Sequence, residues 1–478
     1  MPRRKIRVTG APEAPLRAAL AALRAELGIP AAFPPQVREE AERAAKTPPA
    51  LPSYDATDIP FFTLDPPASA DLDQATHLSR QGTGYRVRYA IADVAAFVVP
   101  GGALDAEAHR RVNTLYFPDG KVPLHPTVLS EGAASLLPDQ VRPAVLWTID
   151  LDAEGRTLAV DVRRALVRSR ARLDYARVQK EIDAGTAEEP VALLKEIGEA
   201  RGRQETERGG ISLNVPEQQI TEQDHTYVLR YRAPLPADGW NAQLSLLTGM
   251  AAADLMLAQG TGILRTLPAA PDGAVARLRR TATALHIDWP HHVSYAALIR
   301  TLDPHDTRHA AFLQECTTLL RGSGYTVFRD GVLPAITTHS AVAAPYTHCT
   351  APLRRLADRY ASEICLAAVA GQAPPDWVRD ALDALPRRMA DGARIAGTVE
   401  RECVDIVEAA LLKDRVGDVF EGCVVEVDEH RPTVGTVQVD SPAVIGRIEG
   451  DRLPLGERLR VRLSRAEPGT TKILFVPA

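Results

Sequence analysis

One pair of strand-like runs limits the choice of fold more than any other feature of the sequence. Residues 144–173 read AVLWTIDLDAEGRTLAVDVRRALVRSRARL, two β-rich runs around the turn Asp152–Gly155, which predicts an antiparallel hairpin. Residues 84–99, GYRVRYAIADVAAFVV, alternate and then become continuously apolar, as a strand entering a buried sheet does. Apolar helical patterns come later, at residues 241–260, 353–371 and 393–414. Strands first and helices later predict an α+β fold with a large mixed domain.

Two smaller segments flank this mixed region, which we expect to cover residues 56–414. Residues 1–55 hold two helical patterns separated by prolines and followed by a Pro-rich linker. They predict either a small module resembling a helix-turn-helix or a helix pair that packs on its neighbours. Residues 415–478 hold about five short β-rich runs divided by Gly, Pro and Asp turns. That pattern is typical of a five-stranded OB-type barrel.

Composition excludes several classes of protein but does not choose among the remaining ones. No apolar run approaches the roughly 20 residues that span a bilayer, so we expect no membrane partner. The five cysteines are widely spaced and include no C-x-x-C pair, which argues against disulfides and structural zinc and favours the reducing cytoplasm. The formal net charge of −5 gives no sign of nucleic-acid binding, although a local basic channel can exist within such a total.

An acidic stretch early in the chain is the first candidate site. Residues 61–78, FFTLDPPASADLDQATHL, contain Asp65, Asp71 and Asp73 within nine positions and no lysine or arginine among them. Like charges this close repel unless something offsets the repulsion. Asp71 and Asp73 are two apart, so on an extended backbone both project from one face. Converging carboxylates suit Mg²⁺ or Mn²⁺, and two such ions can cleave a phosphodiester. The alternative is a solvated acidic turn.

A second stretch could bind phosphate. Residues 347–360, THCTAPLRRLADRY, place Arg354 and Arg355 at a predicted helix start. A helix amino terminus with exposed N–H groups and arginines is a phosphate-binding arrangement. The alternative is a capped helix with surface arginines.

Together these stretches resemble the catalytic domain of the RNase II family, which includes RNase R and the eukaryotic exosome nuclease. The family motif TIDP-x-x-A-x-DLDDA is similar to TLDPPASADLDQA here, and the family's HFTSPIRRYADL is similar to THCTAPLRRLADR. The segments IADVAAFV, LYFPDG and VEREC also match, in the family's order, between about residues 58 and 412. The terminal barrel is similar to the S1 domain that follows in that family.

The resemblance implies processive 3′-to-5′ hydrolysis of RNA, from a single-stranded end, to nucleoside 5′-monophosphates. It implies a divalent metal, Mg²⁺ or Mn²⁺ in its place, with two ions at the site. Asp65, Asp71 and Asp73 match the family's metal-binding and catalytic aspartates. Gln74 stands where the family has a fourth aspartate and could still offer a neutral carbonyl oxygen. Arg354 matches the arginine that grips the scissile phosphate.

The resemblance also assigns residues that contact the substrate. Tyr116 matches the aromatic residue that stacks on the terminal base, and Arg355 lies beside the phosphate-binding arginine. Glu400 matches a glutamate near the active site. Tyr175 and Gln243 fall where the family reads the ribose, and a contact to the 2′-hydroxyl separates RNA from DNA.

Departures from the family pattern leave other functions open. Family members begin with two cold-shock-type barrels, and we expect residues 1–55 to stand in their place. Gln74 and Gln243 replace family carboxylates, which motivates a second reading as a catalytically weakened RNA-binding regulator. A third reading is a DNA exonuclease. For the leading reading, a metal-dependent exoribonuclease, we expect a monomer.

Overall fold

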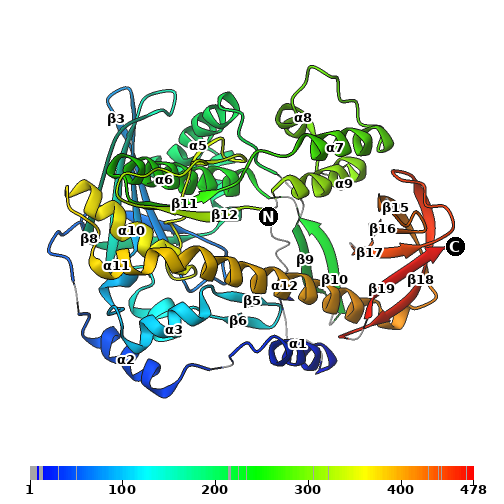
Figure 1. Ribbon diagram of the computed structural model, residues 1–478, viewed down its shortest axis with the longest axis horizontal. Coiled ribbons are helices and arrows are strands. Elements are labelled where there is room, and N and C mark those ends of the chain that lie inside the picture. The colour runs from blue at the N-terminus through cyan, green and yellow to red at the C-terminus, as the bar shows by residue number, and fades with distance from the viewer. Residues whose placement is uncertain are drawn as a thin grey trace.

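Two closed β-barrels, joined by helices, form the molecule in the computed structural model (Figure 1). In Figure 1 they lie at opposite ends of the long axis, and a long helix runs between them. The structure describes residues 8–9, 14–30, 32–49, 51–213, 217–223, 226–232, 234–304, 306–320, 322–428, 430–439, 441–442, 444–469 and 471–478.

The first barrel has the strand order β2-β3-β4-β7-β8 and closes through a parallel pairing of β2 with β8. Its strands are β2 (Phe61–Leu64), β3 (Gln74–Gln81), β4 (Gly84–Ala92), β7 (Val141–Leu151) and β8 (Thr157–Leu173). The predicted hairpin is confirmed as β7 and β8. At its turn, Gly155 has φ +80°, and an added Cβ would lie 2.9 Å from the Cβ of Ala200. Only glycine suits both demands.

Helices cover this barrel and carry much of the core. They are α3 (Ala103–Arg111), α4 (Tyr175–Asp183), α5 (Glu189–Glu207), α6 (Pro236–Gln259), α10 (Leu356–Val369), α11 (Asp376–Ala381) and α12 (Leu385–Leu412). The three predicted helices are confirmed as α6, α10 and α12. Helix α12 begins earlier than predicted because Pro386 lies in its first turn, where no backbone donor is needed. The α+β expectation is confirmed.

Smaller elements complete the middle region. A short hairpin consists of β5 (Leu115–Phe117) and β6 (Gly120–Val122). Three helices form a separate group: α7 (Asp272–Ala284), α8 (Tyr295–Thr301) and α9 (Thr307–Cys316). The other strands are β1 (Val8–Thr9), β9 (Glu217–Gln223), β10 (Thr226–Arg232), β11 (Gly262–Thr266), β12 (Gly324–Phe328), β13 (Thr338–His339) and β14 (Ala344–Pro345).

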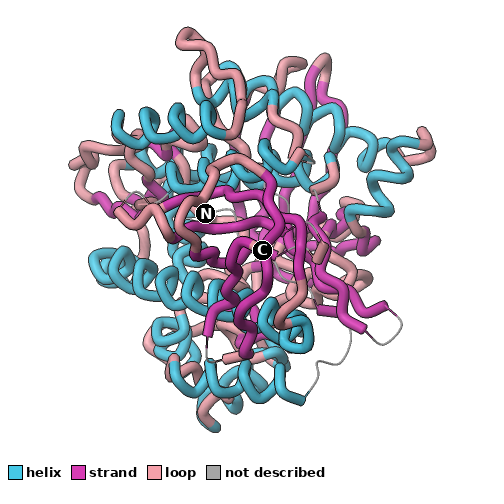
Figure 2. The backbone as a smooth tube through the Cα atoms, turned by 90° about the vertical axis from the view of Figure 1, so that its right-hand side faces the viewer, coloured by secondary structure: helices cyan, strands magenta, loops and turns pink. Residues whose placement is uncertain are grey.

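The predicted terminal barrel is confirmed as a closed sheet with the order β15-β16-β17-β19-β18. Its strands are β15 (Val419–Val427), β16 (Val434–Val439), β17 (Val444–Glu449), β18 (Arg458–Glu467) and β19 (Thr471–Pro477). Figure 2 looks onto this barrel, with the C-terminus in front. Its apolar interior is continuous with the end of α12, so barrel and helix share one core.

The two helices predicted before residue 56 are α1 (Ala14–Glu26) and α2 (Pro35–Lys46). They contribute to different apolar clusters. Helix α1 packs with β5, α12 and the terminal barrel, whereas α2 packs with α3 and the first barrel. This arrangement favours helices that pack on their neighbours over a separate helix-turn-helix module. None of the helices in the described ranges has the length and apolarity that crossing a bilayer requires.

Candidate active site

The acidic stretch lies at one rim of the first barrel, because it connects β2 to the neighbouring strand β3. Ser135 fixes its backbone: the Ser135 hydroxyl accepts a hydrogen bond from the N–H of Leu72 at 2.9 Å and donates to the carbonyl of Ala70 at 2.7 Å. The exposed fractions of Asp71 and Asp73 are only 8% and 1%. The alternative of a solvated acidic turn is therefore wrong.

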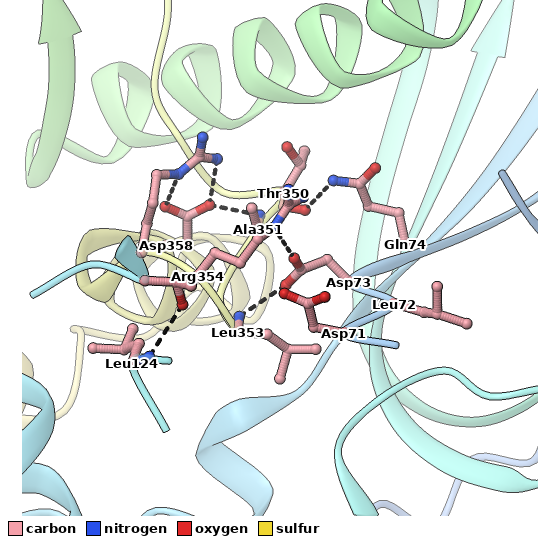
Figure 3. Close-up of polar contacts among 12 residues, drawn as sticks. Asp71, Leu72, Asp73, Gln74, Leu124, Thr350, Ala351, Leu353, Arg354 and Asp358 are labelled. Atoms are coloured by element: carbon pink, nitrogen blue, oxygen red, sulfur yellow. Dashed lines mark hydrogen bonds and ion pairs between the residues drawn. The ribbon is translucent and has the colours of Figure 1, made fainter. Parts of the chain in front are cut away.

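Asp73 is bound by the second predicted stretch (Figure 3). Its Oδ1 accepts a hydrogen bond from the backbone N–H of Leu353 at 2.8 Å, and its Oδ2 accepts one from Nε of Arg354 at 2.6 Å. Burial raises the pKa of Asp73 to about 6, although the positive charge of Arg354 opposes the rise. The two stretches, far apart in the sequence, thus meet at one carboxylate.

Asp71 has a different cationic partner. Nζ of Lys121 lies 2.8 Å from Oδ1 of Asp71 and 2.9 Å from a carboxylate oxygen of Glu131. The hydroxyl of Tyr116 lies 3.5 Å from Oδ2 of the same aspartate. Tyr116 and Lys121 are directly opposite on the β5–β6 hairpin, so their side chains share one face. That shared face is directed at Asp71.

Asp65 is the aspartate whose carboxylate remains incompletely satisfied. Its Oδ2 is buried and has no hydrogen-bond partner among the described residues. Burial raises the pKa of Asp65 to about 7; Arg354 opposes this rise, and the neighbouring charges of Asp73 and Asp71 add to it. A buried carboxylate oxygen without a partner is costly, and a bound cation would satisfy it.

Of the four predicted metal ligands, Asp65, Asp71 and Asp73 have the chemistry that a metal site requires, and their role as ligands stays a prediction. Buried, mutually repelling carboxylates with an orphaned oxygen suit a hard cation such as Mg²⁺. The role of Gln74 also stays a prediction: its Nε2 donates to the carbonyl of Thr350 at 2.5 Å, and its Oε1 accepts from the hydroxyl of Tyr89 at 3.0 Å. Both ends of the amide are therefore used. As arranged, the described residues contain no cluster of three or more His, Cys, Asp or Glu side chains that could hold a metal ion. Three aspartates fit the ion chemically, but two of them are already paired with protein cations.

The two residues predicted to read the ribose lie in different places. The hydroxyl of Tyr175 accepts a hydrogen bond from Nδ2 of Asn241 at 3.2 Å, and burial, with a contribution from Asp65, raises its pKa. Tyr175 therefore lies close to the acidic site. Gln243 does not: it is buried, and its amide donates to Glu205 of α5. The contact of Gln243 with the ribose stays a prediction, and helix geometry explains why Gln243 and Tyr175 have different partners.

Residues one turn apart on α6 share a face, whereas a residue two positions on points elsewhere. Asn241 and Ser245 are one turn apart, and the Ser245 hydroxyl lies 3.0 Å from the hydroxyl of Tyr89, the partner of Gln74. Sequence reasoning missed both residues, since nothing in the sequence gives the orientation of α6.

Lys121 was also missed, although a signal for it was present. The segment Phe117-Pro118-Asp119-Gly120 has the composition of a tight turn. A two-residue turn at Pro118 and Asp119 pairs Tyr116 with Lys121, as observed. Sequence reasoning could therefore have placed this lysine beside the predicted stacking residue.

For two further predicted residues, Arg355 and Glu400, the structure gives no contact that puts them beside the three aspartates of the acidic stretch. Arg355 donates from Nε and Nη2 to the two oxygens of Asp358, at 2.9 and 2.8 Å. Asp358 also accepts from the N–H of Ala351 at 2.7 Å, so this pair closes the loop before α10. Glu400 lies half-buried in the middle of α12, which packs on β5. Their roles toward substrate stay predictions. Arg354 and Arg355 are both half-buried and paired with carboxylates, which disfavours the alternative of surface arginines.

Comparison with known protein families decides the family of this chain. A family model described as RNB domain matches residues 53–371, more than half of the chain. The chain belongs to the RNB-domain family. A second model, described as RNase II-type exonuclease C-terminal S1 domain, matches residues 418–478. The resemblance seen in the motifs is confirmed, as is the likeness of the terminal barrel to an S1 domain.

Individual relatives agree with this RNB assignment. Ribonuclease R of Escherichia coli (strain K12) is 26% identical over 469 residues, covering 88% of this chain but 57% of its own length. The chain thus spans little more than half of that relative. The structure of Mycoplasma genitalium RNase R with ribose-methylated single-stranded RNA matches with a TM-score of 0.85 at 19% identity, over 97% of this chain and 78% of the other. Yeast Ssd1, described as a pseudonuclease, matches with a TM-score of 0.69 at 15% identity, over 87% of this chain and 53% of the other. At these identities both structures establish the RNB fold alone.

The raised carboxyl pKa values predict how the stability of the metal-free RNB domain depends on pH. The folded protein keeps protons on Asp65, with a pKa of about 7, and on Asp73, with a pKa of about 6, which the unfolded chain releases near 3.8. The stability that these groups contribute is therefore fully present below about pH 4 and is lost progressively as pH rises from there to about 7. We expect the melting temperature in EDTA to fall over this interval by a few degrees more for the wild type than for Asp65→Asn. Equal slopes for the two proteins would contradict the buried, raised state of Asp65.

Proposed function

We propose that this chain is a metal-dependent exoribonuclease that processively hydrolyses single-stranded RNA from the 3′ end to nucleoside 5′-monophosphates. The observation that carries the proposal is the meeting of the buried Asp71 and Asp73 and the half-buried Asp65 with Arg354, from a stretch far away in the sequence, at the rim of the RNB barrel. This arrangement combines a site for a hard cation with a cation for the phosphate, which phosphodiester hydrolysis requires.

Asp65, Asp71 and Asp73 would hold Mg²⁺, with Mn²⁺ as a substitute. The chemistry expected from a bound ion is activation of a water and neutralisation of charge at the phosphate. Asp65 offers its unpartnered oxygen. Asp73 holds Arg354 in place through a charge-assisted hydrogen bond at 2.6 Å.

The chain's own residues would bind and orient the RNA end. Arg354, whose side chain keeps 35% of its surface exposed while it contacts Asp73, would stabilise negative charge developing on the phosphate oxygens. Tyr116 is 46% exposed beside Asp71, so its ring is free to stack on the terminal base and align the last nucleotide. Tyr175, close to Asp65, would contact the ribose.

A second candidate function is an RNA-binding regulator that has lost most hydrolysis. Two observations favour it: both ends of the Gln74 amide are engaged, and Lys121 already neutralises Asp71. The fold is also compatible with this role, since Ssd1 is described as a pseudonuclease.

The deciding experiment incubates 5′-labelled single-stranded RNA with the protein and Mg²⁺, with EDTA as the control. Stepwise shortening from the 3′ end with release of 5′-monophosphates supports the exoribonuclease. A stable shifted complex without shortening supports the regulator. A DNA oligonucleotide of the same sequence should remain intact, and degradation of that DNA at a similar rate would favour the DNA exonuclease.

Lys121 allows a prediction about metal affinity that does not depend on hydrolysis. Its ammonium lies 2.8 Å from Asp71, where it competes with any cation for that carboxylate. Removing one positive charge at such a distance should strengthen Mn²⁺ binding by about tenfold for a partly exposed site. Calorimetry of Lys121→Met should therefore give a lower Kd for Mn²⁺ than the wild type, whereas Lys180→Met, exposed on α4, should not. An unchanged Kd in Lys121→Met would contradict the competition.

A further inference from the structure

The β5–β6 hairpin has two faces with different surroundings. On one face Tyr116 and Lys121 are directed at Asp71. Phe117 follows Tyr116 on β5, so its side chain points to the opposite face of the hairpin. Phe117 is 6% exposed. The guanidinium of Arg24 lies 4.0 Å from the centroid of the Phe117 ring. The hairpin is therefore held between the candidate active site and α1.

Arg24 also forms a bidentate ion pair with the turn of this hairpin. Its Nη1 donates to Oδ2 of Asp119 at 3.1 Å, and its Nη2 donates to Oδ1 of the same carboxylate. Bidentate pairing fixes direction as well as distance. The side chains of Arg24 and Asp119 are 21% and 18% exposed, so solvent weakens this pair less than it would a fully exposed one.

Apolar side chains of α1 also pack against the hairpin. Leu16, Leu20 and Leu23 of α1 are buried in one cluster with Leu115 and Phe117 of β5, and the same cluster includes α12 and the terminal barrel. Figure 1 shows α1 beneath α12, near the hairpin and the terminal barrel. A two-stranded hairpin with three residues per strand is marginal by itself. Its orientation therefore depends on the elements packed against it.

We propose that α1 is a brace for the substrate site. Arg24, acting through Asp119 and Phe117, is a positioning residue that sets the hairpin so that Tyr116 meets the terminal base and Lys121 meets Asp71. This inference rests on the proposed exoribonuclease function for its effect on RNA, but its effect on the hairpin is independent of hydrolysis. It gives residues 14–26 a role that sequence reasoning did not provide.

Two measurements on Arg24→Ala test the brace. Hydrogen exchange of the amides in residues 115–122 should become about tenfold faster, whereas exchange in the β7–β8 hairpin should not change. The kcat for single-stranded RNA should fall by about tenfold, because misplacement of an orienting group lowers turnover. The KM should stay within about twofold, since contacts outside the hairpin also bind RNA. Arg17→Ala, an exposed change on the same helix, is the matched control and should match the wild type in both measurements.

Rescue separates positioning from general destabilisation. Arg24→Asp combined with Asp119→Arg should recover part of the slow exchange and of the lost kcat, because the swap restores the ion pair but not the guanidinium contact with Phe117. Arg24→Lys should lie between the wild type and Arg24→Ala. Unchanged exchange at residues 115–122 in Arg24→Ala would overturn the proposal, as would accelerated exchange throughout the molecule. If the wild type hydrolyses no RNA, the proposed function fails; the brace is then decided by the exchange measurement alone.

Discussion

Replacing Asp73 by asparagine should lower RNA hydrolysis by at least about a thousandfold while RNA binding is retained. Both oxygens of Asp73 are already acceptors, from the N–H of Leu353 and from Nε of Arg354. Asparagine keeps one acceptor and turns an NH₂ group toward one of these donors. The change therefore removes a charge from the cation site and releases Arg354 from its position.

The measurement pairs hydrolysis of labelled RNA with fluorescence anisotropy of the bound RNA. Asp93→Asn is the matched control, because Asp93 is also a buried aspartate, 3% exposed, and its carboxylate pairs at 2.8 Å with Arg164, which is not one of the predicted site residues. The control should lower the melting temperature without abolishing hydrolysis. Hydrolysis by Asp73→Asn within about tenfold of the wild type would remove Asp73 from the reaction, and loss of RNA binding would assign it a folding or docking role.

The same substitution should have different effects at the neighbouring arginines Arg354 and Arg355. Arg354→Gln should reduce kcat by about a hundredfold or more, since it removes the cation that faces the phosphate. Arg355→Gln should mainly reduce stability. Asp358 is 0% exposed and pairs with Arg355 at 2.8 Å, and loss of one partner of a buried pair costs about 3 kcal/mol.

Urea unfolding and single-turnover hydrolysis, measured on both variants, separate these effects. We expect the larger change in midpoint for Arg355→Gln and the larger change in rate for Arg354→Gln, so that each variant serves as the control for the other. If Arg355→Gln were the slower enzyme at full occupancy of the folded state, the predicted substrate role of Arg355 would hold instead of the structural one.

Two features offset the repulsion among the three aspartates of the acidic stretch, which has no basic residue of its own between them. Lys121 and Arg354 neutralise Asp71 and Asp73 from elsewhere in the chain, and Asp65 keeps a buried oxygen for which the described residues offer no donor. A site with partial internal neutralisation requires less charge from bound metal than three isolated carboxylates would.

Much of the architecture was predictable because its signals are local. Alternation and the Asp152–Gly155 turn predicted the β7–β8 hairpin, and apolar spacing predicted α6, α10 and α12. These patterns depend only on residues that are close together along the chain, so they can be recognised without knowledge of the fold. The order of five motifs then indicated the family, which the RNB match over residues 53–371 confirms.

The details of the site depended on the tertiary structure. The sequence by itself determined that carboxylates and arginines were present, and in which helix or strand to expect them. Only the folded chain brought Lys121 to Asp71 and turned Asn241 rather than Gln243 toward Tyr175. The physical reason is distance along the chain: an ion pair depends on charges within a few ångströms in space, and residues far apart in sequence reach that distance only when the whole core has packed.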